Sequence, residues 1–157
     1  MSHYAVIEGY NAAIIVTTIA EELSAVSPEL HTQTLKTICL SGGAMCLNVT
    51  QQYLDYVLGS ELVTPEAKQV MAAYKPVPTV VLYEDFFTEM SKEESEAVMW
   101  HEVGHIVNSH HLQPANEGLF SVVLENEVTA DAFAAEKVSK EAMSSALHKL
   151  FRATAKQ

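Results

Sequence analysis

The pentapeptide HEVGH, residues 101–105, is the feature that most constrains how this chain can fold. SKEE at residues 91–94 has the spacing of a capping box, which predicts that a helix begins there and runs through the pentapeptide. On a helix, His101 and His105 lie on one face with their rings converging. Two histidines placed in this way suit two ligands of one tetrahedral zinc ion. The fold must therefore bring a further ligand to this helix from another element.

Glu102 has a different place on the same helix, about a hundred degrees around the axis from His101. There it can take a proton from a metal-bound water without itself binding the metal. Hydrolytic zinc sites have three protein ligands and leave the fourth position to water. Glu102 is therefore the candidate general base, and a third ligand has to be found.

The run ENEVTAD, residues 125–131, offers that ligand on a second expected helix. Glu127 is the candidate, and Asp131 lies four residues later on the same helical face. Asp131 can accept a hydrogen bond from the ring nitrogen of His101 that does not touch the metal. Glu125 is a weaker candidate, since only Glu127 has an acid four residues later. A solvated acidic face is the competing interpretation of Glu127 and Asp131.

The remaining patterns predict one domain over residues 1–157, mainly helical and of the α+β class. Residues 1–75 are expected to be mostly helical, with Thr64 and Pro65 beginning one of the helices. The β-branched run at 77–84 is the best strand in the chain. Pro76 and Pro78 cannot donate ladder hydrogen bonds, which favours a sheet edge for this strand. Residues 76–157 would form the catalytic part, with a last helix capped by Ser139.

The charge and apolar patterns exclude several classes of protein. A net charge of −11 with scattered acids argues against a nucleic-acid or anionic-membrane surface. The longest apolar window, residues 12–20, is half the length of a membrane span, and residues 1–10 lack the basic region of a signal peptide. Cys39 and Cys46 favour reduced thiols, because small secreted domains usually carry more cysteines. A cytoplasmic location is expected, and oligomeric state is left open.

HEVGH followed by N-E-x-x-x-D resembles the gluzincin metallopeptidases, the class with a glutamate as third zinc ligand. The segments VVLYEDFFTEMSKEESEAVMWHEVGHIVNSH and ENEVTADAFAA are most similar to the M48 branch, the HtpX-like peptidases, or to a minimal soluble gluzincin. ADAFAA also resembles the ImmA-like metallopeptidases, the second choice. Phe133 stands near the position where the M48 branch often has arginine, and residues 1–75 match nothing recognisable.

The resemblance implies a zinc metalloendopeptidase of zincin-like fold that binds one zinc ion per chain. His101, His105 and Glu127 would hold the metal, Glu102 would be the base, and Asp131 would support a histidine. It also implies that an extended peptide substrate pairs with the edge strand beside the helix. The residues expected to form that edge are Val80, Val81, Leu82 and Tyr83.

Two other functions remain open on the sequence. A zinc-binding domain that no longer cleaves could act as a protein-interaction module, although the intact Glu102 argues against it. A di-iron bundle would need a second Glu-x-x-His, which the chain lacks. No spacing selects the donor that stabilises the oxyanion. The residues weighed for that role or for lining the cleft are Tyr83, His110, His111, His148 and Arg152.

Overall fold

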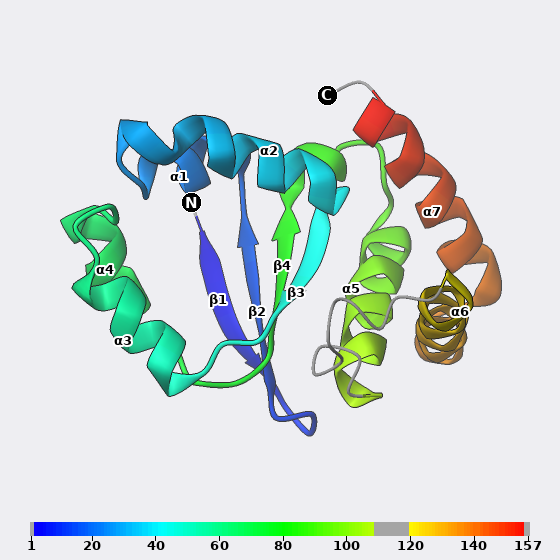
Figure 1. Cartoon of the computed structure of the whole chain (residues 1–157). Coiled ribbons are helices and arrows are strands. Elements are labelled where there is room, and N and C mark those ends of the chain that lie inside the picture. Colours follow the sequence, from blue (N-terminus) through cyan, green and yellow to red (C-terminus); the bar gives the residue numbers. More distant parts are fainter. Residues whose placement is uncertain (1, 109–119, 156–157) are drawn as a thin grey trace.

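A four-stranded mixed sheet forms the centre of the fold, in the order β1-β2-β4-β3 (Figure 1). The computed structural model describes the backbone of residues 2–108 and 120–155 and the side chains of 2–108 and 125–149. Strands β1 and β2 form an antiparallel hairpin, β2 and β4 are parallel, and β4 and β3 are antiparallel. The strands are β1 (His3–Ile7), β2 (Ala12–Thr17), β3 (Ala44–Leu47) and β4 (Thr79–Tyr83).

Helices cover the sheet, and the longest of them lie together beside β3 (Figure 1). Helix α5 packs against β3 and β4 on one side and against α6 and α7 on the other. Two 3-10 turns, Pro28–Leu30 and Glu84–Phe86, join the elements. The helices are α1 (Ile19–Ser24), α2 (His31–Ser41), α3 (Gln51–Gly59), α4 (Pro65–Met71), α5 (Lys92–Val107), α6 (Phe120–Lys137) and α7 (Lys140–Ala155). The mainly helical α+β class is confirmed.

The core has two parts because successive side chains of β4 point to opposite faces of the sheet. Val80 and Leu82 join a cluster with buried residues of α5, α6 and α7. Val81 and Tyr83 join a second cluster with Ile38 of α2. The face that carries Val80 is thus the one on which the HEVGH helix packs.

The prediction that residues 1–75 are mostly helical is wrong for three segments, which form β1, β2 and β3. Strand β2 pairs with a neighbour on each side, and its apolar run shows no polar alternation. Such a run fits a helical stripe as well as a strand, so periodicity could not separate the two. The turn between β1 and β2 holds Gly9 at φ 85° and Asn11 at φ 47°, a backbone conformation that ends regular structure.

The prediction that the strand at 77–84 lies at a sheet edge is also wrong. Strand β4 has β2 on one side and β3 on the other, and all five of its residues are buried. Pro76 and Pro78 precede the strand, so their missing N–H groups interrupt no ladder within it. The carbonyl of Pro78 accepts a hydrogen bond from the Ala13 N–H at 3.0 Å. The edge nearest α5 therefore belongs to β3, and Val80–Tyr83 cannot pair with a substrate.

The predicted helix starts are confirmed by their caps. The Thr64 hydroxyl accepts from the Ala67 N–H in front of α4, with Pro65 at the first helical position. Ser91 and Glu94 form the complete capping box of α5. Ser139 accepts from the Ala142 N–H at the start of α7. A proline cannot continue a regular helix, which predicts an end to this helix before Pro114, but Pro114 lies outside the described residues.

Glu94 joins the start of α5 to α7. Its carboxylate accepts hydrogen bonds from Lys149 Nζ at 2.8 Å and Ser145 Oγ at 2.6 Å, and from the Ser91 N–H at 2.9 Å. The Lys149 contact, followed by those of Ser145 and Ser91, lowers the pKa of Glu94 from its ordinary 4.5 to about 2. A buried carboxylate with these partners stabilises the packing of α7 against α5.

We expect Glu94→Gln to lower the free energy of unfolding by about 2 kcal/mol at neutral pH, because hydrogen bonds to a charged group are lost. The folded pKa of Glu94 lies below its unfolded value, so this stabilisation is present above about pH 4.5 and is lost towards pH 2. Denaturant unfolding at pH 7 and pH 3 measures the effect. Glu93→Gln, an exposed neighbour in the same turn, is the matched control. An equal loss in both variants would contradict the prediction.

Candidate metal centre

Two helices bring the three candidate ligands together. His101 and His105 project from α5, and Glu127 projects from α6. His101 Nε2 lies 3.0 Å from Glu127 Oε2, and His105 Nε2 lies 3.4 Å from Glu127 Oε1. The two Nε2 atoms are 3.2 Å apart. Among the described residues these three side chains form a group that could hold a metal ion, with one ligand atom from each within 4.8 Å of the others.

The donor set and spacing fit a tetrahedral ion. Zinc bonds to imidazole nitrogen and carboxylate oxygen are about 2.0–2.1 Å long, so two tetrahedral ligands lie about 3.3–3.4 Å apart. The observed separations of 3.0, 3.2 and 3.4 Å are close to that value. The 3.0 and 3.4 Å separations reach different oxygens of Glu127, so the carboxylate would have to shift for one oxygen to become the third ligand atom beside the two Nε2 atoms. Three protein ligands leave one tetrahedral position open.

Close packing of α5 on α6 sets the distance between the two histidines and Glu127. A Cβ added to Gly104 would lie 3.1 Å from Ala130 Cα and 3.2 Å from Phe133 Cβ, tighter than ordinary contact. Glycine at position 104 therefore lets α6 approach the helix that carries the histidines. Phe133 also packs against Trp100 of α5, and Lys137 Nζ lies 5.2 Å from the centre of the Trp100 ring. Phe133, noted in the sequence only as a departure from an expected arginine, is thus part of the helix interface.

The electrostatics of the group favour a positive charge between the ligands. Hydrogen bonds from His101 and His105 hold the pKa of Glu127 well below its usual range. Burial alone lowers the pKa of His101. The contact with Glu127 and the charges of Glu102, Glu127 and Asp131 outweigh that effect and raise the pKa overall. A proton on His101 occupies the place that a cation could take, so metal binding would release it.

Asp131 lies one helical turn beyond Glu127, on the far side of His101. Its Oδ1 accepts a hydrogen bond from His101 Nδ1–H at 2.7 Å, which leaves Nε2 of the neutral ring free as a ligand atom. His101 is buried, so this contact fixes both the tautomer and the orientation of the ring. Asp131 therefore contacts His101, and its support of a metal ligand stays a prediction.

We expect Asp131→Asn to weaken zinc binding by about tenfold to a hundredfold, because the neutral amide holds the His101 ring less firmly. Competition with a chromophoric chelator measures the affinity. Glu136→Gln, an exposed acid on the same helix, controls for the loss of one negative charge. Unchanged affinity in Asp131→Asn would show that the contact with His101 does not orient a ligand.

Glu102 lies beside the three candidate ligands, and a residue of β3 contacts it. Cys46 Sγ is 3.1 Å from Glu102 Oε2 and 3.2 Å from the Glu102 carbonyl oxygen. Burial, followed by the negative charge of Glu102, raises the pKa of Cys46, so the thiol stays protonated and donates. The sequence had indicated only a reduced thiol for Cys46, and this contact was missed.

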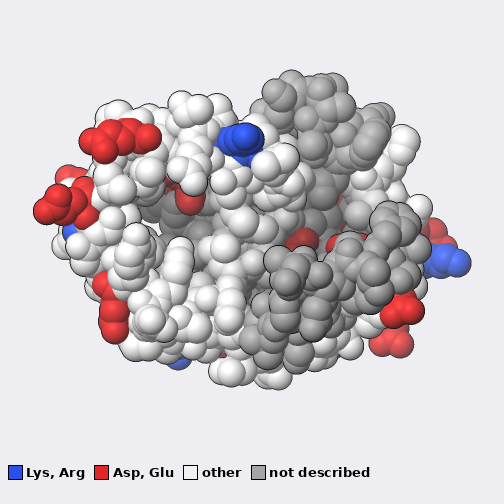
Figure 2. All heavy atoms as spheres, in the orientation of Figure 1, with Lys and Arg blue, Asp and Glu red and all other residues white. Residues whose placement is uncertain are grey.

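A hollow of about 480 Å³ opens over Glu102 and the three ligands. Its walls come from β3 and the end of α2 on one side and from α5 and α7 on the other. In the orientation of Figure 1, Figure 2 shows acidic groups at both the left and the right side of the molecule. Besides the acidic and histidine side chains, the hollow is lined by Ser41, Gly42, Ala44, Met45, Val98, Met143 and Leu147.

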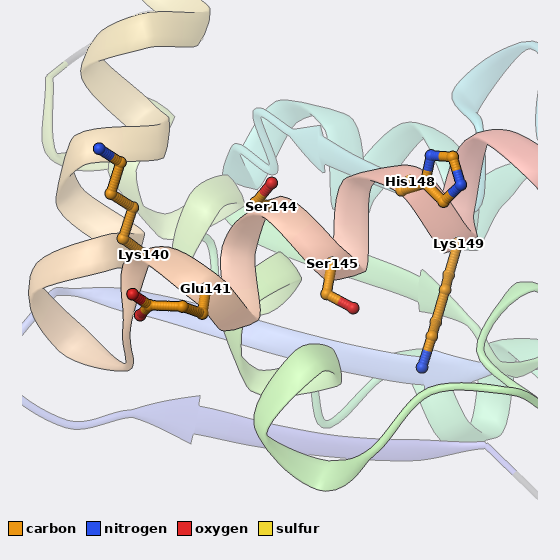
Figure 3. A pocket seen from close by; sticks show the side chains of 6 residues that line it. All are labelled: Lys140, Glu141, Ser144, Ser145, His148 and Lys149. Carbon is orange, nitrogen blue, oxygen red and sulfur yellow. The ribbon is translucent and has the colours of Figure 1, made fainter.

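The other residues weighed on the sequence do not line this hollow where they are described. Tyr83 is 1% exposed and belongs to the core cluster on the opposite face of the sheet. His148 lines a separate, open hollow along α7 with Lys140, Glu141, Ser144, Ser145 and Lys149 (Figure 3). His110, His111 and the side chain of Arg152 lie outside the described residues.

Sequence reasoning missed the walls of the site as well as Cys46. Met143 and Leu147 are four residues apart on α7, which is the spacing of any amphipathic helix and carries no sign of a site. Strand β3 was the one segment that could have been found, since its short apolar run follows Gly42–Gly43 and precedes Asn48.

Comparison with known proteins gives one match. Residues 58–124 match the profile of peptidase family M48, which confirms the resemblance to that branch. The matched segment contains β4 and the HEVGH of α5 and ends before Glu127 and Asp131. No curated protein and no solved structure matches the chain. The match supports a metallopeptidase in general. No helix within residues 2–108 and 120–155 has the length and apolar character needed to cross a bilayer.

Proposed function

We propose that this protein is a zinc-dependent metalloendopeptidase in which Glu102 is the general base. The observation that carries the proposal is the convergence of His101, His105 and Glu127, with ligand atoms within 4.8 Å of one another beside Glu102. The M48 match over residues 58–124 supports peptide hydrolysis as the class of reaction. The third ligand lies outside the matched segment, so its assignment rests on geometry.

Each side chain of the site would have its own role in hydrolysis. Zinc bound by the three ligands would lower the pKa of a water molecule to about 7 and polarise the scissile carbonyl. Glu102 removes the proton from the attacking water and delivers it to the leaving amine. Asp131 keeps His101 in the tautomer that presents Nε2 to the metal. The apolar wall of Val98, Met143 and Leu147 limits the access of bulk water to the reacting groups.

Strand β3 takes the place of β4 as the edge that binds an extended peptide. The Tyr83 N–H donates to the Gly43 carbonyl at 2.9 Å, and hydrogen-bonded pairs alternate along an antiparallel ladder. The backbone groups of Ala44 and Cys46 therefore point away from β4, along the outer edge of the sheet. A substrate segment added at this edge would gain backbone hydrogen bonds and lie across Glu102.

Metal analysis combined with a peptide-library assay tests the proposal. Mass spectrometry of the untreated protein should find one zinc per chain, and cleavage should stop on chelation and return with zinc. His105→Ala should lose the metal, whereas His148→Ala, which changes a histidine outside the metal group, should keep it. A zinc-loaded protein that cleaves no peptide in a broad library would overturn the enzyme assignment and favour a silent zinc-binding module.

A further inference from the structure

Cys46 of β3 contacts Glu102, the proposed general base. The sequence motif that predicts the metal site does not include Cys46. The Cys46 thiol can donate to the Glu102 carboxylate, with Sγ 3.1 Å from Oε2, and its Sγ also lies 3.2 Å from the Glu102 carbonyl oxygen. It lies 56 residues before Glu102 in the chain, so only the packing of α5 on β3 brings them together. The Cys46 side chain packs with the core cluster beneath α5 and does not line the hollow.

We propose that Cys46 is a positioning residue, whose thiol holds the Glu102 carboxylate in the orientation needed for proton transfer. The inference rests on the proposed peptidase function. A glutamate on a helix surface has several accessible rotamers, and fixing one of them costs side-chain entropy. A hydrogen bond to one carboxylate oxygen selects a rotamer and leaves the other oxygen for the proton of the attacking water.

A buried thiol has the properties that this role requires. The Cys46 environment keeps the sulfur protonated, because burial and the charges of Glu102 and Glu127 disfavour a thiolate. A thiol is a weak donor, so it orients the carboxylate while withdrawing little electron density from it. The donor also sits on the strand proposed to bind the substrate. One short strand therefore fixes the position of the base relative to the peptide backbone.

Substitutions of Cys46 separate positioning from packing. Cys46→Val has a similar size and no donor, and we expect its kcat to fall by about tenfold to a hundredfold with KM within about twofold. Cys46→Ser restores a donor and should keep kcat within about fivefold of the parent. Cys39→Ser changes the other cysteine, which has no contact with Glu102 among the described residues, and is the control. Circular dichroism and zinc content establish that each variant is folded and loaded.

A spectroscopic measurement tests the contact without relying on activity. In a Cys39→Ser protein the single S–H stretching band belongs to Cys46. Adding Glu102→Gln should move that band to higher frequency, because an amide oxygen accepts more weakly than a carboxylate. X-ray absorption at the zinc edge should find nitrogen and oxygen neighbours and no sulfur.

Several outcomes would overturn the inference while leaving the peptidase function intact. These are a Cys46→Val enzyme with the kcat of the parent, an S–H band that Glu102→Gln does not move, and a sulfur ligand on the zinc. A zinc-loaded parent protein that cleaves nothing overturns the proposed function, and the positioning role with it. The two failures are therefore distinguishable.

Discussion

Replacing Glu102 with glutamine is expected to lower kcat by about 10²- to 10⁴-fold while one zinc per chain stays bound. Glutamine keeps the size of the side chain but cannot accept a proton from the attacking water. The three proposed ligands, His101, His105 and Glu127, are unchanged, so the metal affinity should stay near that of the parent. Initial rates on a cleaved peptide, together with metal analysis of the same samples, measure both quantities.

Glu125→Gln is the matched control for this change. It makes the same chemical substitution at an exposed position of α6, outside the group of possible ligands. We expect it to keep both activity and zinc. Parental activity in Glu102→Gln would end the assignment of Glu102 as base. Loss of zinc in that variant would mean that Glu102 is itself a ligand, in conflict with the observed geometry.

Replacing Glu127 with glutamine is expected to weaken zinc binding by at least about a hundredfold. The loss of zinc affinity should exceed that of Asp131→Asn. Glu127 is the proposed ligand, whereas Asp131 only holds the ring of His101 through a hydrogen bond. Removing the carboxylate takes away the charge that balances the cation and leaves two histidines, too few for a closed tetrahedral set. Chelator competition at neutral pH measures the affinity, and activity should be lost in parallel.

Glu125→Gln again serves as the control, because it is the other acid that the sequence offered as a ligand. If Glu125→Gln lost zinc and Glu127→Gln kept it, the ligand assignment would be reversed. Parental affinity in both variants would leave His101 and His105 without a carboxylate partner from α6. Only the second result would remove the basis for proposing a hydrolytic site, because the first keeps three protein ligands.

The helical half of the site could be predicted because its pattern is local. The spacing of His101 and His105, and of Glu127 and Asp131, places each pair on one face of a helix whatever lies around it. Capping boxes and proline positions act over three or four residues, so the starts of α4, α5 and α7 followed from the sequence.

The strands were harder to predict, because strand pairing is decided between segments far apart in the chain. No residue of β2 is exposed on either face of the sheet, and a strand covered on both faces loses the alternation that identifies a half-exposed one. The order β1-β2-β4-β3 places β4 in the middle of the sheet although β3 precedes it in the chain. Prolines next to β4 indicated an edge, but they precede the strand, so their missing N–H groups interrupt no hydrogen bond within it.

By itself, the amino-acid sequence determined which side chains share a helical face, since 3.6 residues per turn put positions four apart side by side. Only the tertiary structure decided how far α6 stands from α5, which strand borders the hollow and which group contacts Glu102. Those features depend on packing between distant residues, such as Gly104 against Ala130 and Cys46 against Glu102. Helix periodicity carries no information about either contact.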